Sequence, residues 1–545
     1  MAASPDSKRW FAAAIAIVSV VIPVLDNTIL NVAIPTILRE FHTELPSLQW
    51  VVTGYALTIA SLLVIGGRLG DLYGHRRTFI VGAVIFAIGS GLGSISHSVP
   101  TLFVGEALIE GIGAALLFPA TLSILSTTFT GAERATAFAA WGAMAGAAVA
   151  FGPFVGGFLT TTYSWRWALR INVIVAPLLA IGAWLFMRRD ERPTGRPRLD
   201  APGAMLLSAG MFSLVFGLSE SAHYGWWKPL RGFSVAGWNA WPGNRPVSIV
   251  PLAFACAGVL LTTFVFVERA KERRGRDPLF EFGQLEHLGF RYGLLTTMVL
   301  AAGQFALLFV LPVLLQDALH LSALRTGAWM LPTGVMIALG APIGGRLVRR
   351  GVNVTTVVRT GLVLEASGLV LVAAAATEHA SFWSLLPGSL AFGLGVGFAS
   401  SQLTNVILSD IAPSKAGVAS GANSTVRQAG WALGIATFAA LLNVQTIRHA
   451  IEGVRRAPLG ASTRTQAVAE LHARGVNFSL RAVSPAEGST LRHIVDHAIA
   501  SGARPALLFG ATIVAVGAGL SLLIPTVPSP MTATMPEPSP APELA

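Results

Sequence analysis

The chain has 545 residues, of which 53% are hydrophobic and only 12% are charged. A soluble domain carries about 25% charged residues, so the composition excludes a water-soluble globule, and the low charge also excludes an extended disordered chain. A single cysteine excludes a disulfide scaffold. The net charge of +11 comes from basic residues that lie mainly in short gaps between apolar runs. That pattern is typical of membrane topology rather than of nucleic-acid binding, so no nucleic-acid partner is expected.

Apolar runs long enough for a membrane-spanning helix recur along the whole chain, because about 20 such residues cross a bilayer. Fourteen transmembrane helices are predicted, near residues 11–37, 47–67, 78–97, 101–125, 135–160, 168–187, 202–220, 247–267, 292–316, 326–347, 355–376, 382–407, 418–443 and 504–524. An even number places both termini on one side of the membrane. The surplus of Arg and Lys in alternate short loops predicts that this side is the cytoplasm.

An internal repeat divides the chain. The triplet at 67–69 recurs at 345–347, and the triplet at 111–113 is echoed at 393–395, each about 280 residues later. Repeated halves that enclose a site near the middle of the membrane are the architecture of secondary transporters. The predicted organisation is an N-terminal six-helix half (10–187), a linker region with two inserted helices (188–291), a C-terminal six-helix half (292–526) with an external segment (444–503), and a disordered Pro-rich tail (527–545).

The most specific segment is GRLGDLYGHRR, residues 67–77, between the second and third predicted helices. Its glycines permit a tight turn where two helices nearly touch. Asp71 can accept charge-assisted hydrogen bonds from a nearby Arg or from a helix N-terminus. The alternative is a positively charged loop that only anchors the topology.

The fifth predicted helix carries a second segment, GPFVGG at 152–157, preceded by Gly146. Proline removes a backbone hydrogen bond and small residues permit close helix contact, so this helix can kink and slide against a neighbour. Ordinary helix packing is the alternative interpretation.

Both segments resemble signatures of the major facilitator superfamily. Residues 67–77 are similar to its cytoplasmic signature, which is thought to latch one conformation. The resemblance assigns the latch to Gly67, Arg68, Asp71, Gly74, Arg76, Arg77 and Arg134. Residues 152–157 are similar to the antiporter signature, which nutrient importers generally lack, and the residues concerned are Gly146, Gly152, Pro153, Gly156 and Gly157.

Further segments, at 25–35, 50–55, 164–172 and 419–428, look like the fourteen-helix drug/proton antiporter-2 family. The resemblance implies a monomeric, multi-pass protein of the bacterial cytoplasmic membrane that exports drugs or antibiotics in exchange for protons. The chain contains no Gly-Lys dipeptide and therefore no Walker A loop, so ATP is not expected to drive it. We expect no enzymatic activity, no bound metal and no cofactor, because a proton gradient supplies the energy.

Three acids inside predicted helices are candidates for proton coupling. The family usually has Arg at the position of Glu106 and Gln at that of Glu110, so its acid–arginine pairing does not carry over. At 1.5 Å per residue, Asp26 and Glu106 both lie about 8 Å from the outer face, with Glu110 a turn deeper. Neighbouring buried carboxylates cannot all ionise cheaply, so at least one should bind a proton. The alternative is that Glu106 pairs with Arg166 or Arg170 for structural reasons.

Several polar and aromatic residues are candidates for a substrate cavity, namely Trp50, Tyr55, Gln304, Gln402, Asn405 and Arg427. For the amides, hydrogen bonding between helices is an equal alternative. The substrate stays open at this level. An apolar lining with acids would suit a lipophilic cation, yet similar proteins also export neutral and anionic antibiotics. A transporter of a metabolite or a lipid-like molecule on the same scaffold is the alternative function.

Overall fold

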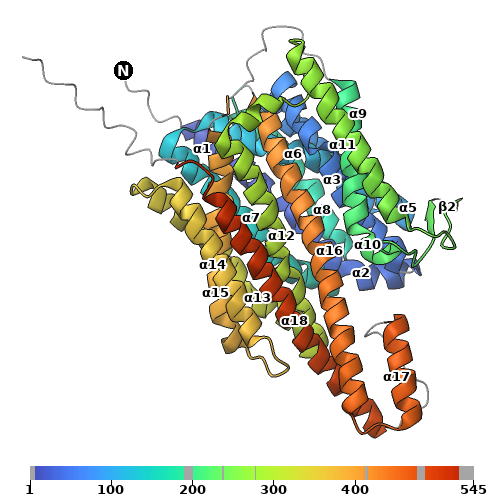
Figure 1. Ribbon diagram of the computed structural model, residues 1–545. Coiled ribbons are helices and arrows are strands. Elements are labelled where there is room, and N and C mark those ends of the chain that lie inside the picture. Colours follow the sequence, from blue (N-terminus) through green and yellow to red (C-terminus); the bar gives the residue numbers. More distant parts are fainter. Residues whose placement is uncertain are drawn as a thin grey trace, which may run out of the picture.

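The computed structural model describes residues 7–43, 45–188, 200–235, 238–276, 278–409, 411–412, 415–474 and 485–526. Within these ranges the chain forms long helices and one two-stranded antiparallel sheet (Figure 1). Thirteen helices in the described part are long and apolar enough to cross a membrane. The 32-residue α7 (Gly131–Thr162) occupies the remaining predicted span, so the all-α membrane fold is confirmed and fourteen spans are accommodated.

The first six predicted spans correspond to α1 (Ser7–Ser19) with α2 (Val21–Phe41), α3 (Leu45–Tyr73), α4 (His75–Ser94), α5 (Val99–Leu102) with the π-helix η1 (Phe103–Glu110) and α6 (Gly111–Thr128), α7, and α8 (Arg166–Phe186). The region between the halves contains α9 (Ala201–Ser219), α10 (Ser221–Tyr224), β1 (Phe233–Val235), β2 (Trp238–Trp241), α11 (Ile249–Arg273) and the 3-10 helix η2 (Phe282–Glu286). The remainder consists of α12 (Leu288–Val313) with the π-helix η3 (Leu314–Ala318), α13 (Ala323–Arg349), α14 (Val354–Ala375), α15 (Phe382–Ser409), α16 (Ala416–Arg456), α17 (Ala461–Arg474) and α18 (Pro485–Ser521).

Two predicted spans are not single α-helices. The first is interrupted at Val20, between α1 and α2. Pro23 follows at once, and because proline has no N–H it cannot bond to the carbonyl four residues earlier. The fourth span widens into a π-helix over the eight residues of η1. Hydropathy predicts neither the break at Val20 nor the π-helix, because both segments remain apolar.

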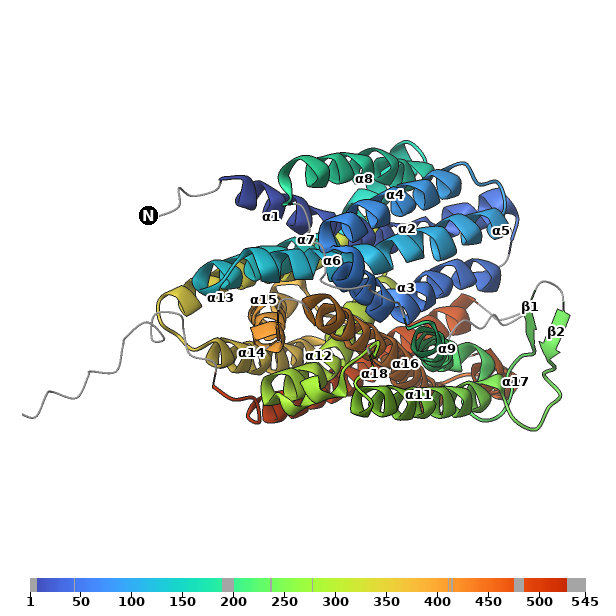
Figure 2. The same cartoon turned by 90° about the horizontal axis from the view of Figure 1, so that it is seen from above.

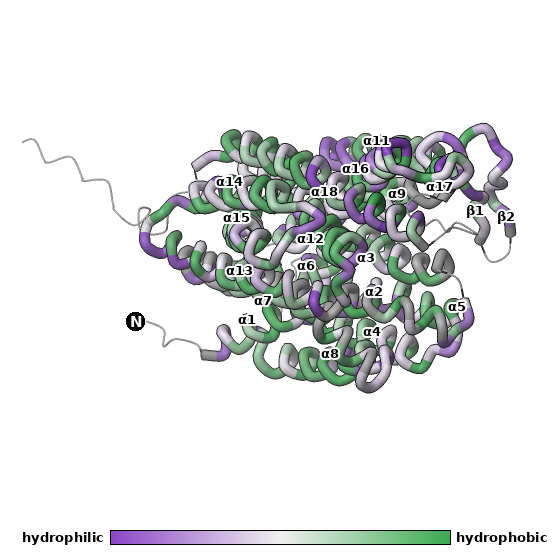
Figure 3. The backbone as a smooth tube through the Cα atoms, turned by 90° about the horizontal axis from the view of Figure 1, so that it is seen from below, coloured by the Kyte–Doolittle hydropathy of each residue, from purple (hydrophilic) through white to green (hydrophobic). Residues whose placement is uncertain are grey.

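The helices form two groups that pack against each other along several helix pairs. Viewed from above, α1–α8 lie on one side and α12–α16 with α18 on the other (Figure 2). Along the boundary α7 packs against α13 and α3 packs against α16. The inserted helices α9 and α11 pack against each other, and α9 also contacts α3 and α16. Hydrophobic residues run along the helices and hydrophilic residues gather at their ends (Figure 3), as expected for helices surrounded by lipid.

The sequence repeat has a structural counterpart in two glycine crossings. A Cβ atom on Gly113 of α6 would collide with the backbone of Phe86 on α4. In the same way, a Cβ atom on Gly395 of α15 would collide with the backbone of Glu365 on α14. At both crossings two helices touch through their main chains, which only glycine allows.

A second pair of crossings lies further along the same helices. Gly89 of α4 meets the backbone of Glu110, and Gly368 of α14 meets the backbone of Phe392. The two halves therefore use the same geometry with opposite side chains. At the first pair of crossings the residue opposite the glycine is Phe86 in the first half and Glu365 in the second. At the second pair it is Glu110 in the first half and Phe392 in the second.

The helices that contain the predicted spans 418–443 and 504–524 are longer than those spans. The last helices continue well beyond them, from Ala416 to Arg456 and from Pro485 to Ser521, and with α17 they build an extension far from α1 (Figure 1). This extension has its own small core of Ala450, Ile451, Val454, Leu459, Ala467, Leu471, Leu491 and Ala498. Its polar outer surface lowers the hydropathy, so a search for apolar runs does not detect it. Residues 475–484 and the Pro-rich tail lie outside the described residues.

The inserted helix pair is tied together at one end by a charged cluster. Asp200 caps α9 by accepting a hydrogen bond from the N–H of Gly203 (3.1 Å). Lys271 of α11 pairs with Asp200 and with the buried Glu268. Glu268 also accepts hydrogen bonds from the main-chain N–H of Leu279 (2.5 Å) and of Phe280 (3.2 Å). A buried carboxylate needs such partners, so this cluster fixes the connection that leads into the second half.

The predicted orientation can be tested with cysteine labels at four exposed positions, after replacement of Cys256 by alanine. We expect Lys228→Cys and Ala461→Cys to react with an impermeant maleimide added to intact cells, and Arg274→Cys and Arg350→Cys to react only after permeabilisation. The reason is that the loops rich in Arg and Lys face the cytoplasm. The reverse pattern of labelling would overturn the orientation.

Candidate functional site

The three acids predicted to couple protons come together in the N-terminal half. Asp26 lies on α2, and Glu106 and Glu110 lie on η1. All three are buried, with exposed fractions of 2%, 1% and 0%, and a carboxylate oxygen of each lies within 4.8 Å of the others. We call Asp26, Glu106 and Glu110 the acid triad. Its compactness agrees with the equal depth that the helix rise predicts for Asp26 and Glu106.

The local sequence explains why η1 can carry two acids into this position. Gly105 of η1 packs against the main chain of α4 at Gly93, where an added Cβ would lie 2.7 Å from the Gly93 nitrogen. This close approach holds η1 against α4. A π-helix also has a wider turn than an α-helix and is frequent at functional sites. The two glutamates, four residues apart, both contribute to the triad.

The triad has few partners. The side-chain amide of Asn172 on α8 donates to Oδ1 of Asp26 (2.8 Å) and, more weakly, to Oε1 of Glu110 (3.5 Å). In the part of the chain that the structure describes, both oxygens of Glu106 lack a hydrogen-bond partner. The hydroxyl of Tyr55 is also buried without one. Asn172 was missed as a site residue, although an amide within an apolar run is a signal that sequence reasoning can use.

The arginines proposed as alternative partners of Glu106 are engaged elsewhere. Arg166 pairs with Glu40 (2.5 Å), and Arg170 lies over the ring of Trp167, 5.5 Å from its centroid. Among the described residues no Lys, Arg or His lies within ion-pair distance of the triad. Within the described structure the triad is therefore a cluster of carboxyl groups without a counter-cation. Three carboxylates at this spacing can bind protons, and they can also ligate a divalent cation.

The segment at 67–77 joins the two halves. The carboxylate of Asp71, near the end of α3, accepts hydrogen bonds from the N–H groups of Gly417 (2.8 Å) and Val418 (2.9 Å) in the first turn of α16. Of the two partners predicted for Asp71, a nearby Arg or a helix N-terminus, these hydrogen bonds are made by the helix N-terminus, which attracts negative charge. The main chains also touch here, because a Cβ atom on Gly67 would collide with the carbonyl of Gly417. We call this arrangement the α3–α16 contact.

The other latch candidates lie in α3, in the turn after it, in α4 and in α7. Gly74 has a φ of +100°, which favours glycine, and it forms the turn from α3 into α4. Arg76 donates to the carbonyl of Trp184 on α8 (2.5 Å). The guanidinium of Arg134 lies over the ring of Phe138, 5.7 Å from its centroid. Of the two further residues of the segment, Arg68 is half-buried and Arg77 is exposed.

The helix 5 segment lies in α7, at the boundary between the halves. Gly156 packs against the backbone of Ile29 on α2, and Gly142 packs against Ser401 on α15. Gly152 is buried. The surroundings of Gly146, Pro153 and Gly157 fall outside what the structure describes, although all three lie in α7. Small residues thus let α7 contact helices of both halves.

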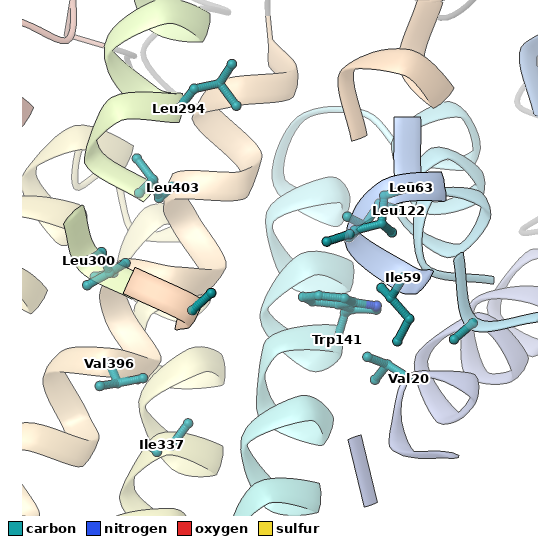
Figure 4. Packing of buried hydrophobic residues seen from close by; sticks show 14 of the residues in the cluster. Val20, Ile59, Leu63, Leu122, Trp141, Leu294, Leu300, Ile337, Val396 and Leu403 are labelled. Atoms are coloured by element: carbon teal, nitrogen blue, oxygen red, sulfur yellow. The ribbon is translucent and has the colours of Figure 1, made fainter. Parts of the chain in front are cut away.

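A cavity lies between the two halves. Its empty space amounts to about 940 Å³, part of it open to solvent. Figure 4 shows apolar side chains on both sides, with Leu122 and Trp141 from the first half and Ile337 and Val396 from the second. Its lining consists of Val20, Val24, Leu63, Phe118, Leu122, Trp141, Gly142, Ala145, Gln304, Leu308, Ile337, Phe392, Val396, Ser400, Asn423, Ser424, Arg427, Gln428 and Trp431.

The six predicted cavity residues are divided between several places. Gln304 and Arg427 line the central cavity. Tyr55 lies near the acid triad instead, and Gln402 is fully buried beside Ser401. Asn405 is half-buried on α15 and does not belong to the lining.

Trp50 lines a second, lateral pocket between α3, α9 and α11. Its neighbours there include Phe103, Phe216 and Phe233. Glu220 occupies the C-cap position of α9. A tryptophan near the outer end of a helix can face either neighbour, and its sequence position does not decide between the two.

Two groups of helices with a cavity between them, a charged contact across one end and a cluster of three buried acids in one group define a secondary membrane transporter. Comparison with protein families matches residues 16–435 to the Major Facilitator Superfamily. The chain belongs to this superfamily and is a multi-pass protein of the plasma membrane.

Its relatives include proteins named for antibiotic resistance and export. The chain is 34% identical to the puromycin resistance protein pur8 of Streptomyces alboniger, over 79% of this chain and 81% of that protein. It is 32% identical to a probable actinorhodin transporter of Streptomyces coelicolor, over 85% and 79% of the two chains. The tetracenomycin C resistance and export protein of Streptomyces glaucescens is also 32% identical, over 78% and 74%.

Solved structures share the fold at low sequence identity. The human organic anion transporter MFSD10 superimposes with a TM-score of 0.58 at 14% identity, over 95% of this chain and all (100%) of that one. The proton:xylose symporter XylE gives a TM-score of 0.56 at 13% identity, over 97% and 98%. These likenesses concern the fold alone.

The α3–α16 contact predicts the effect of a conservative change. Asp71→Asn should leave the protein inserted but slow transport about tenfold or more, because a hydrogen bond to a charged group contributes about 1.5–3 kcal/mol. The rate is measured in proteoliposomes at matched protein density. Wild-type rates would show that the segment only anchors the topology.

A steric variant tests the same contact independently. A side chain at Gly417 would collide with the carbonyl of Gly67 and with the Asp71 carboxylate, so Gly417→Val should open this end of the molecule and slow transport. Gly519→Val is the matched control, because nothing lies within 4 Å of a Cβ atom at Gly519. Equal rates for the two variants would contradict a role for the contact.

Proposed function

We propose that the protein is a proton-coupled antiporter that exports drugs or antibiotics by alternating access, acting as a monomer. The named functions of the relatives support the substrate class, since they concern puromycin, actinorhodin and tetracenomycin C. The acid triad supports the coupling. The helix 5 segment, which importers generally lack, supports the direction of transport.

The observation that carries the proposal is the absence of a described counter-cation around the triad. Three carboxyl groups within 4.8 Å repel one another when ionised, and the membrane interior offers little solvation for their charge. Protons neutralise such a cluster in the closed, dry conformation. When the movement of the two halves admits water to the triad, ionisation becomes less costly and protons leave. The triad can therefore load protons on one side and release them on the other.

The α3–α16 contact supports the alternating-access part of the proposal. It joins the halves at one end through main-chain glycine contacts and two hydrogen bonds to Asp71. The central cavity lies between the same halves. Rocking of one half against the other around this cavity requires that the contact break and re-form.

A second candidate function rests on the lateral pocket. This pocket is lined by Trp50, Phe212, Phe216, Phe233 and other largely apolar residues, and it lies beside the inserted helices. Such a lining suits a lipid-like molecule. Under this alternative the protein is a proton-coupled transporter of a metabolite or lipid-like molecule on the same scaffold.

Neutral variants of the triad test the proposed coupling. Asp26→Asn and Glu110→Gln should each abolish transport driven by a pH gradient in proteoliposomes, because an amide cannot release a proton. Both should retain exchange of labelled for unlabelled substrate, because the amide imitates the protonated state. Puromycin, actinorhodin and tetracenomycin C serve as test substrates.

The matched control is Glu365→Gln, which removes a carboxyl that is equally buried but lies in the other half. This variant should keep transport driven by the gradient. Retained gradient-driven transport in both triad variants would place the coupling elsewhere. Transport that follows a gradient of Mg²⁺ or Ca²⁺ instead of protons would show that the triad carries a divalent cation. Transport of lipids alone would favour the second candidate function.

A further inference from the structure

The central cavity has walls of different chemistry. The first half contributes mainly apolar and aromatic side chains, among them Leu63, Phe118, Leu122 and Trp141. The amide, hydroxyl and guanidinium side chains of the described lining come from α12, α15 and α16 of the second half. They are those of Gln304, Ser400, Asn423, Ser424, Arg427 and Gln428.

Among the described residues of this lining, Arg427 is the one with a charged side chain. Its guanidinium donates a hydrogen bond to the Thr404 hydroxyl (3.2 Å), and no carboxylate of the described residues pairs with it. A guanidinium has five N–H donors, so most of them are available to a ligand. The acid triad is not part of this lining, and the described lining residues therefore carry a net positive charge.

Asn423 adds a second, independent observation. Its side chain is 1% exposed and neither amide atom has a hydrogen-bond partner in the described structure. Buried polar atoms nearly always have a partner, so an unpaired amide next to a cavity indicates that a ligand supplies one. Asn423 and Arg427 lie one turn apart on α16 and both line the cavity.

The aromatic residues define the rest of the ligand. Phe118, Trp141, Phe392 and Trp431 line the same space and offer ring faces for stacking. Ring faces also attract cations, but a cation in this cavity would be repelled by the Arg427 guanidinium and would find no carboxylate in the lining. An anionic oxygen would instead gain charge-assisted hydrogen bonds.

We propose that the central cavity binds planar aromatic molecules that carry an anionic oxygen, a carboxylate or a phenolate, and that Arg427 is the residue that selects them. This inference rests on the proposed export function and names its substrate class. The acids that the sequence suggested as partners for a lipophilic cation lie outside the lining, which leaves them to proton coupling.

The test uses three probes on one ring system. They are anthraquinone-2-carboxylate, the neutral primary amide of that acid, and the amide that carries a trimethylammonioethyl group. Binding to the full-length protein in nanodiscs is measured by quenching of tryptophan fluorescence, since Trp141 and Trp431 line the cavity. We expect the carboxylate to bind about tenfold more tightly than the cation, the effect of roughly one charge-assisted bond.

Variants assign the preference to one residue. Arg427→Gln should weaken carboxylate binding about tenfold and leave the neutral amide within about twofold, whereas Arg427→Lys should keep the preference. Arg325→Gln is the control for the loss of a charge, because Arg325 is exposed at the start of α13 and outside the lining.

Two results would overturn the proposal. One is a cation that binds the wild-type protein as tightly as the carboxylate. The other is undiminished carboxylate binding in Arg427→Gln. The wild-type comparison needs no variant, so it decides the question even if Arg427→Gln does not fold. Binding is measured without a gradient, and a failure here is therefore distinct from a failure of proton-driven transport.

Discussion

Contact between helix main chains at glycine positions the functional groups of this protein. Gly105 brings η1 against α4, and this contact carries Glu106 and Glu110 to the side chain of Asp26. Gly67 and Gly417 bring α3 against α16, and Asp71 thereby reaches the first N–H groups of that helix. In a membrane there is no hydrophobic drive between helices, so such close packing is a main source of their association. Acid triad and inter-half contact thus depend on the same kind of interaction.

The two ionic features separate by half. The acid triad belongs to the first half, and the cavity guanidinium of Arg427 belongs to the second. If Arg427 lay close to the triad, it would form an ion pair with a carboxylate. The guanidinium would then stabilise the ionised form of the acids, and they would bind protons less readily. Arg427 instead donates a hydrogen bond to Thr404, and Asp26 accepts one from Asn172. The guanidinium therefore stays available for a substrate, and the acids stay available for protons. The proposed division of tasks, protons in one half and substrate oxygen in the other, follows from this separation.

Much of the fold was predictable because hydropathy and helix rise are properties of the chain itself. The apolar runs predicted the fourteen spans, and the fixed rise per residue predicted that Asp26 and Glu106 share a level. Lateral neighbours were not predictable in the same way. Nothing in the sequence around Trp50 indicates that it faces α9 rather than the central cavity, or that Asn172 turns toward Asp26. The continuation of α16 and α18 beyond the apolar runs was not predicted from hydropathy, because the core of this extension is small and its surface is polar.

The exchanged side chains at the repeated crossings bear on how such proteins diversify. Phe86 and Glu365 occupy matching places in the two halves, as do Glu110 and Phe392, and in each case the contact is made by the main chain opposite a glycine. The main-chain contact at the crossing is therefore the same whether the residue opposite the glycine carries an aromatic ring or an acid. Mutation can relocate an ionisable group from one wall of the transporter to the other without rebuilding the scaffold. In this architecture the four glycines therefore allow the position of the coupling acids to change during evolution while the helix packing stays the same.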